Sequence, residues 1–269
     1  MKHIRLIRLI SLIVIAAGAA LASPAQTGTN STAAPQAEAV LKKAVQTLGG
    51  DKYLNVTTQI GRGKFSVIRD NAVVSFQSFY DVIVYPDKER TEFKGGGVRS
   101  VQTNTGAAGW VFDGDSNLIK DQTDAQIDNF QLGMRASLDT LLRGHWRGKA
   151  KLSYIGKRPA TLGKRNEVLK LEYDDGMIVE FEFAADDGLP VKSIRKRTNA
   201  DNETVNEEDR YAQFVDIAGI RTPFIIERVT NGIPTSRINY ESVEYNKPIN
   251  DSIFTKPGSL KELKKNLNL

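Results

Sequence analysis

The sequence predicts a mainly β protein with a few helices, and three observations carry this prediction. From Thr57 onward, apolar and polar residues alternate with a period of two, the pattern of strands with one buried face. Dipeptides typical of hairpin turns separate these stretches, namely Asp70-Asn71, Asp175-Gly176, Asp187-Gly188 and Asn231-Gly232. The pattern amounts to about ten or eleven strands, at the spacing of an antiparallel sandwich or barrel.

Residues 1–22 have the three parts of a secretory signal peptide. Basic residues precede an apolar run, which ends in the small-residue site Ala20-Leu21-Ala22. A membrane-spanning helix requires about 20 apolar residues, and this run is shorter. We therefore expect export to the periplasm with cleavage after Ala22. Cleavage after Ala25 and an uncleaved anchor are the alternatives.

The remaining chain is predicted to contain a linker, one domain and a tail. Residues 23–35 are small and polar, as in disordered linkers. Residues 36–257 are assigned to a single domain, which begins with an amphipathic helix closed by Gly49 and Gly50. Residues 258–269 are expected to form a short basic amphipathic helix or a frayed tail.

A helix is predicted to interrupt the strands from Thr123 to about Arg143. Thr123 and Gln126 have the spacing of a capping box, which satisfies free backbone N–H groups at a helix start. Apolar residues then follow at spacings of three and four, which places them on one face of the helix. This stripe consists of Ile127, Phe130, Met134, Leu138 and Leu141.

The composition argues against most kinds of catalytic site. There is no cysteine, and of the two histidines only His145 lies outside the predicted signal peptide. A His/Cys zinc site and a Cys-His nucleophile therefore cannot be built, and we expect neither a cofactor nor a metal. Without the signal peptide, 34 basic residues face 32 acidic ones, which gives no support for nucleic-acid binding. A pair of catalytic carboxylates stays formally possible.

Three loose motifs resemble a known family. They are "VYPDKERTEF" from Val84, "VQTNTGAAGWVFDG" from Val101 and "DSIFTKP" from Asp251. With the initial helix and the helix between strands, they resemble the LolA/LolB-like outer-membrane lipoprotein-sorting proteins over most of residues 36–257. The resemblance implies a curved antiparallel sheet that forms an unclosed β-barrel, covered by helices as a lid, with an apolar space for acyl chains.

The resemblance also implies where a ligand would lie. The apolar stripe of the predicted helix would cover the concave side of the sheet, and the aromatic strand before it would point into the same space. The expected lining residues are Trp110, Phe112, Ile127, Phe130, Met134, Leu138, Leu141 and Phe181. The alternative is that these residues form an ordinary dry core. Arg62 is a candidate for the arginine that latches a carrier's lid, with a solvated strand arginine as the alternative.

Three functions fit this sequence to different degrees. The first is a non-enzymatic periplasmic carrier, expected to be a monomer, for lipoproteins or other acylated or hydrophobic ligands. The second is an envelope interaction or sensor module, which would use the same fold to bind a protein partner without a lipid ligand. An enzyme, such as a hydrolase or a peptidase accessory, is the third and is least compatible with the side chains present.

Overall fold

One antiparallel sheet of 13 strands makes up most of the described chain, which comprises residues 33–198 and 202–269 of a computed structural model. The strands are β1 (Thr58–Arg69), β2 (Ala72–Val84), β3 (Lys88–Gly95), β4 (Val98–Thr105), β5 (Gly109–Asp113), β6 (Leu118–Asp121), β7 (Ala150–Pro159), β8 (Arg165–Tyr173), β9 (Ile178–Ala184), β10 (Pro190–Thr198), β11 (Thr204–Ile217), β12 (Ile220–Thr230) and β13 (Ile233–Tyr245). The predicted signal peptide and most of the predicted linker lie outside the described residues.

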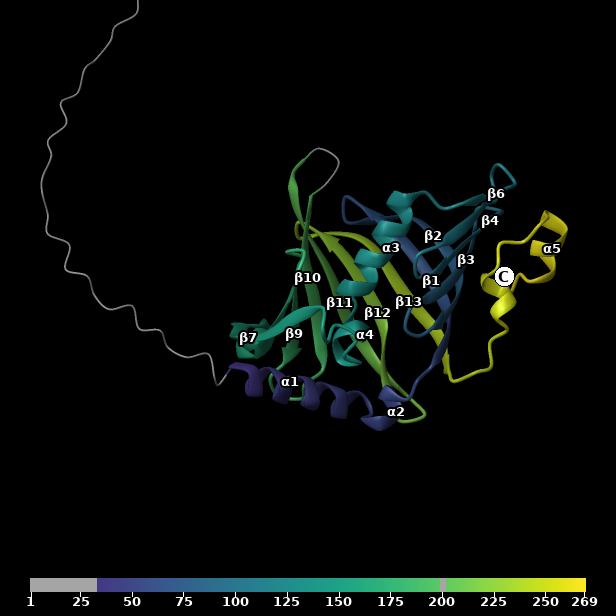
Figure 1. Cartoon of the computed structure of the whole chain (residues 1–269). Helices are drawn as coiled ribbons and strands as arrows, with labels where there is room; N and C mark the ends of the chain where they lie inside the picture. Colours follow the sequence, from purple (N-terminus) through teal and green to yellow (C-terminus); the bar gives the residue numbers. More distant parts are fainter. Residues whose placement is uncertain (1–32, 199–201) are drawn as a thin grey trace, which may run out of the picture. The chain divides into compact units, whose positions relative to one another are not determined.

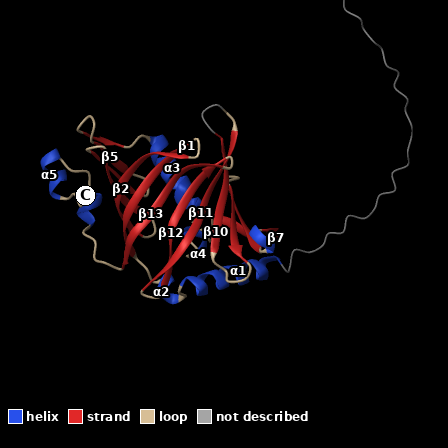
Figure 2. Cartoon of the chain, turned by 180° about the vertical axis from the view of Figure 1, so that it is seen from behind, coloured by secondary structure: helices blue, strands red, loops and turns tan. Residues whose placement is uncertain are grey.

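The sheet is curved and unclosed, which confirms the predicted architecture (Figure 1). Strands β1 to β6 follow one another outward in one direction, and β13 back to β7 follow in the other. The two halves are joined at the centre, where β1 pairs with β13, and seen from behind they form one continuous sheet (Figure 2). Strands β6 and β7 form the two edges and do not pair with each other. The sequence underestimated the number of strands, because elements as short as β6 are too brief to show a period of two.

The predicted hairpin turns are all present. Asp70 and Asn71, between β1 and β2, both have positive φ angles, of 51° and 59°. Asn231 and Gly232, between β12 and β13, have φ angles of 49° and 82°. Two consecutive residues with positive φ match the right-handed twist of the flanking strands. Asn, Asp and Gly adopt this conformation most readily, so local sequence determines these turns.

The helices are α1 (Ala33–Leu48), α2 (Asp51–Leu54), α3 (Asp124–Ala136), α4 (Leu138–Leu142) and α5 (Leu260–Lys265), with short 3₁₀ turns at Thr161–Gly163 and Asp251–Phe254. Helix α1 includes the last residues of the predicted linker. Helices α3 and α4 connect β6 to β7, the two edge strands, and lie over one face of the sheet (Figure 1). We call this the inner face and the opposite one the outer face. The chain thus crosses from one edge of the sheet to the other in helical form.

The predicted helix from Thr123 to Arg143 is in fact two helices. Its start is as predicted, since the capping box of Thr123 and Gln126 is formed. The break lies at Ser137, whose ψ of 149° is extended. The Ser137 side chain accepts a hydrogen bond from the backbone N–H of Thr140 and so caps α4. A serine can satisfy the backbone in this way at a cap, whereas inside a helix it competes with the helical bonds.

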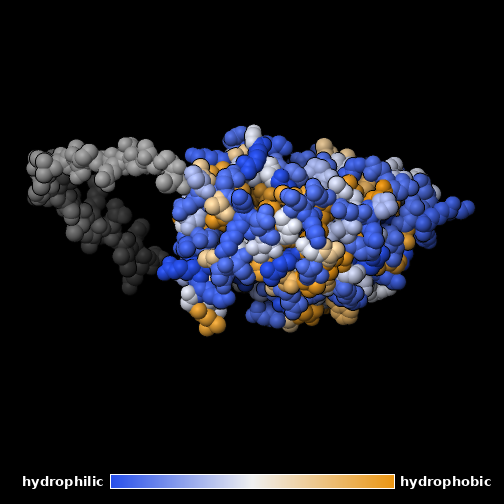
Figure 3. Space-filling view, turned by 90° about the horizontal axis from the view of Figure 1, so that it is seen from below, coloured by the Kyte–Doolittle hydropathy of each residue, from blue (hydrophilic) through white to orange (hydrophobic). Residues whose placement is uncertain are grey.

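The main core lies between α1, α4 and the inner face of β8 and β9. Leu41, Ala44 and Leu48 of α1 are buried in it against Leu169 and Phe181. Seen from below, the surface over α1 and α2 is mostly hydrophilic, with hydrophobic residues in scattered groups (Figure 3). Helix α1 is thus amphipathic as predicted, with its apolar side packed on the sheet. None of the helices in the described part of the chain is long and apolar enough to cross a membrane.

Candidate functional site

A cavity of about 810 Å³ lies between α3–α4 and the inner face of the sheet. Side chains from β1 to β4 and from β9 to β13 line it. Because β1 pairs with β13, these two groups of strands, which are distant in sequence, enclose one space. The volume falls in the range of about 300–1,000 Å³ that is usual for sites of small organic ligands.

Aromatic rings form one wall of the cavity. The rings of Phe65 and Phe93 are 5.6 Å apart, and those of Phe79 and Tyr240 are 5.4 Å apart, both edge to face. Gly61 makes room for this arrangement, because a Cβ atom there would lie 2.5 Å from the Tyr240 ring. The aromatic wall thus depends on a glycine in the central strand, and it offers an apolar surface to a ligand.

The cover of the cavity is provided mainly by α3. Phe130, Met134 and Leu138 line the cavity and are each only partly buried. Within α3 only Ala136 is buried, whereas α4 buries three of its five residues. Helix α4 is therefore anchored in the core, and α3 lies over the cavity with few buried contacts of its own.

Three other residues predicted to line a cavity are placed differently. Leu141 and Phe181 are both fully buried, and they belong to the main core rather than to the cavity wall. Ile127 is half-buried near the start of α3 and does not line the cavity. The apolar stripe therefore divides, since its middle faces the cavity and its end packs in the core.

Trp110 and Phe112 lie on the outer face, away from the expected position. They pack with Val101 and with Leu263 of α5. The Trp110 indole N–H donates a hydrogen bond of 2.8 Å to the backbone oxygen of Phe254. The alternation along β5 correctly places both aromatic residues on one face, but the C-terminal segment covers that face. The C-terminal residues accordingly form a docked helix rather than a frayed tail.

The three motifs that suggested the family meet in this outer cluster. Arg90, from the first motif, lies with its guanidinium 5.5 Å from the Trp110 ring of the second. Arg90 also donates a 2.8 Å hydrogen bond to the backbone oxygen of Ile253, in the third. Its buried ion-pair partner is Glu92, at 3.1 Å. These residues therefore fasten the C-terminal segment to β3 and β5 and do not line the cavity.

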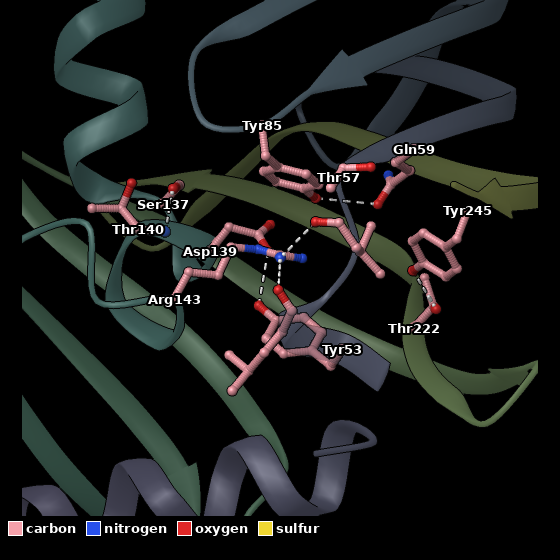
Figure 4. A network of polar contacts seen from close by, with 12 residues as sticks. Tyr53, Thr57, Gln59, Tyr85, Ser137, Asp139, Thr140, Arg143, Thr222 and Tyr245 are labelled. Atoms are coloured by element: carbon pink, nitrogen blue, oxygen red, sulfur yellow. Dashed lines mark hydrogen bonds and ion pairs between the residues drawn. The ribbon is translucent and has the colours of Figure 1, made fainter. Parts of the chain in front are cut away.

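Arg143, at the end of α4, connects the helices over the cavity to the rest of the domain (Figure 4). Its Nε donates to Asp139 at 2.9 Å, and its Nη1 donates to the backbone oxygen of Val56 at 3.0 Å. The guanidinium lies 4.6 Å from the ring of Tyr53 and 4.0 Å from that of Tyr85. Burial and the neighbouring Asp139 raise the pKa of Tyr53 well above its ordinary value. A buried arginine therefore holds α4 against α2 and the start of β1.

Arg62, the predicted candidate for a latch, has a different role. Its guanidinium lies over Tyr80, whose ring packs with Phe254 on the outer face. It forms an exposed ion pair of 3.1 Å with Glu244. The interpretation of Arg62 as a solvated strand arginine therefore agrees with its position.

A second ion pair joins α3 to the turn between β8 and β9. The two terminal nitrogens of Arg135 each donate a 2.7 Å hydrogen bond to the Asp175 carboxylate. These bonds lower the pKa of Asp175 from 3.8 to about 2. Since the pKa is lower in the folded state, the contribution to stability is present above about pH 4 and is lost as the pH falls toward 2.

We predict that Arg135→Gln raises the pKa of Asp175 from about 2 toward 3.8, because the charge and the bidentate donors are removed together while the bond from the Met177 backbone N–H remains. NMR titration of the Asp175 carboxyl in both proteins measures this directly. An unchanged pKa in the variant would mean that α3 is not held at this turn. Arg147→Gln, which removes the 2.9 Å ion pair with Glu38 of α1, is the matched control and should leave Asp175 unaffected.

One end of the cavity carries polar groups that sequence analysis missed. Asp81, Glu89, Thr91 and Asn104 line it from β2, β3 and β4. The available indication was Asp81 itself, a single carboxylate within the otherwise apolar run "FYDVIVY". In a strand that faces a core on one side, such a residue requires a partner or a function. In the described part of the chain, no cluster of three or more His, Asp or Glu side chains is placed to hold a metal ion.

Comparison of this chain with known proteins shows similarity to solved structures in fold, without a match in sequence. No protein-family model matches it, and no curated protein matches its sequence. Solved structures do match over most of their length. A DUF1329 family protein from Desulfovibrio piger is 14% identical with a TM-score of 0.59, over 81% of this chain and 97% of that one.

Two further matches have names that agree with the resemblance seen in the sequence. A LolA superfamily protein from Nitrosomonas europaea is 16% identical with a TM-score of 0.53, over 82% of this chain and 97% of that one. A proposed outer-membrane lipoprotein-sorting protein domain from Vibrio parahaemolyticus is 11% identical with a TM-score of 0.54. The match covers 82% of this chain and 97% of that one. The chain therefore shares its fold, an unclosed barrel covered by helices, with these three proteins.

Proposed function

We propose that this protein is a non-enzymatic periplasmic carrier that holds the apolar part of an acylated or hydrophobic ligand between α3 and the sheet. The observation that carries the proposal is the cavity of about 810 Å³ with its wall of aromatic rings. A cavity of this size beneath a helix with few buried contacts is suited to a ligand that must enter and leave.

The apolar wall can supply the affinity that a carrier needs. Burial of one methylene group contributes about 0.8 kcal/mol, so a chain of about ten methylenes gains about 8 kcal/mol before ordering costs. Ordering costs of about 5 kcal/mol reduce this gain, so a net binding free energy of about 8 kcal/mol, which is a micromolar dissociation constant, requires a chain of about sixteen methylenes. Phe65, Phe79 and Phe93 offer this surface without any catalytic group.

The comparisons and the N-terminal sequence support the cellular setting. Structures with this fold include a LolA superfamily protein and a proposed lipoprotein-sorting domain. The signal-peptide pattern of residues 1–22 supports export. Lipoproteins are the ligand class that these relatives suggest, and other acylated molecules present the same chemistry to the cavity.

The first test is mass spectrometry of an organic extract from the mature protein, purified from its host envelope without detergent. We expect a stoichiometric species that carries an acyl or other long apolar chain. Titration with a fluorescent fatty-acid probe should show one site per chain. An empty extract together with no probe binding would contradict the proposal.

A pair of variants links binding to the cavity. Phe130→Asp should weaken probe binding by at least about ten-fold, because it places a charge in the apolar wall, while the protein stays folded. Leu162→Asp is the control, since Leu162 is 95% exposed on a distant turn, and its binding should be unchanged. If Phe130→Asp unfolds the protein, α3 is part of the core and does not act as a cover.

A second candidate function is supported by exposed apolar side chains on β2. Val73, Val74 and Phe76 are each more than half exposed, and Ile233 is exposed on the adjacent hairpin. Such groups are typical of interaction surfaces, and an envelope protein is the partner that this setting would provide. The same experiment separates the two functions, because an interaction module would yield an empty extract and bind no probe.

A further inference from the structure

The polar end of the cavity is a group of oxygen acceptors, and the two carboxylates among them form no ion pair with a described residue. Asp81 lies opposite Thr91 in the β2–β3 pairing, and Glu89 lies opposite Asn104 in the β3–β4 pairing. The period of two therefore places all four side chains on the inner face, where they line the cavity. Strand pairing thus places two carboxylates, a hydroxyl and an amide at neighbouring positions of three adjacent strands.

Among the described residues, one hydrogen-bond donor, the Thr91 hydroxyl, is shared by the two carboxylates. The Thr91 hydroxyl donates to Asp81 at 2.6 Å and lies 3.5 Å from Glu89. Among the described residues, neither carboxylate forms an ion pair within 4 Å, since Arg228, whose charge acts on both, is paired with Asp209 at 3.8 Å. Burial raises the pKa of both Asp81 and Glu89, and repulsion by Glu89 adds to the effect on Asp81.

Asn104 provides an independent observation. Asn104 is only 2% exposed, and its side-chain oxygen is buried without a hydrogen-bond partner among the described residues. Asn104 also lines the cavity, next to Glu89. Buried polar atoms without partners are rare in folded proteins and costly. A cationic hydrogen-bond donor would satisfy both this unpaired acceptor and the two carboxylates that lack ion pairs.

The surroundings of these acceptors define the rest of the ligand. Phe79 precedes Asp81 by two residues and Phe93 follows Thr91 by two, so both rings lie on the same face as the acceptors. Aromatic faces also attract cations. The cavity therefore has acidic side chains at one end and an apolar surface beside them, which matches an amphiphile with a small positive head.

We propose that the cavity binds an aliphatic chain that ends in a protonated primary amine, with the ammonium group held by Asp81, Glu89 and Asn104 and the chain along the aromatic wall. An ammonium group has three N–H donors, which suits three acceptor side chains. This inference rests on the proposed carrier function and specifies the charge of its ligand.

The experiment is isothermal titration calorimetry of the mature protein with three probes of equal chain length, each below its micelle concentration. The probes are dodecylamine, dodecanol and dodecanoate. We expect dodecylamine to bind at least about ten-fold more tightly than dodecanol, and dodecanoate to bind most weakly. Equal binding of amine and alcohol, or preference for the carboxylate, would overturn the inference. If none of the three binds, the carrier function itself fails.

Asp81→Asn tests the role of the acceptors. The variant should lose the preference for the amine over the alcohol, while its affinity for dodecanol stays unchanged. Its Tm should equal or exceed that of the unaltered protein, because a buried carboxylate without an ion pair is replaced by a neutral amide of the same shape. A lower Tm together with a retained preference would assign Asp81 to the fold alone.

Two controls complete the design. Glu244→Gln removes a carboxylate on the outer face, in the exposed pair with Arg62, and should leave all three affinities unchanged. Titration with calcium chloride in place of the amine tests for a metal site. Binding of calcium with loss of dodecylamine binding would overturn the inference in favour of a metal ion, and absence of calcium binding supports it.

Discussion

Replacement of Arg90 by leucine is expected to lower the free energy of unfolding by about 3–5 kcal/mol. The Arg90 side chain is 2% exposed and that of its partner Glu92 is fully buried. Loss of the arginine would leave the Glu92 carboxylate buried without a cation. It would also remove the donors to the backbone oxygens of Ile253 and Asn266, which hold the C-terminal segment.

Urea denaturation followed by tryptophan fluorescence measures this change, because Trp110 lies in the affected cluster. Arg62→Leu is the matched control, since its ion pair with Glu244 is exposed and is worth about 0–1 kcal/mol. The double variant Arg90→Leu/Glu92→Leu should recover part of the loss, because no unpaired charge is left. A change no larger than that of the control would contradict the structural role assigned to the three family motifs.

Phe181→Ala is the second variant with a large expected effect, a loss of about 3–5 kcal/mol in the free energy of unfolding. Phe181 is completely buried between the sheet, α1 and α4, so its removal leaves a cavity that its neighbours cannot fill. Phe130→Ala, which removes the same atoms from the half-buried face of α3, should cost less than about 1 kcal/mol.

The two variants distinguish a core residue from a residue of the cavity cover, although both Phe181 and Phe130 were predicted from sequence to line the cavity. Chemical denaturation gives both stabilities, and titration with the fatty-acid probe gives both affinities. We expect Phe181→Ala to lower the free energy of unfolding, and Phe130→Ala to lower the affinity for the probe. Similar losses of stability in the two variants would show that α3 is packed as firmly as the main core.

The features predicted correctly from sequence depend on neighbours along the chain. The turns at Asp70-Asn71 and Asn231-Gly232 form because few other residues adopt positive φ twice in succession. The capping box of Thr123 and Gln126 forms for a similarly local reason. The period of two then identifies most of the strands. The prediction of an unclosed barrel came from the resemblance of three motifs to a known family.

The candidate site was predicted only in part. Phe130, Met134 and Leu138 do line the cavity, whereas Trp110 and Phe112 lie beneath α5. Alternation reveals which side chains of a strand share a face, but it does not reveal what covers that face. For β5 the cover is a segment more than a hundred residues later in the chain, which no local pattern connects to it.

Most of the strands, the hairpin turns and the amphipathic helices could be predicted without the structure, because each follows from backbone preferences and burial patterns within a few residues. Three features became evident only in the folded chain: which face of the sheet is hollow, where the α3–α4 segment changes from cover to core, and that Asp81, Glu89 and Asn104 lie on adjacent strands of the same face. The physical reason is that these features arise from pairing between strands and from the curvature of the sheet. Both depend on contacts between residues that are distant in the chain.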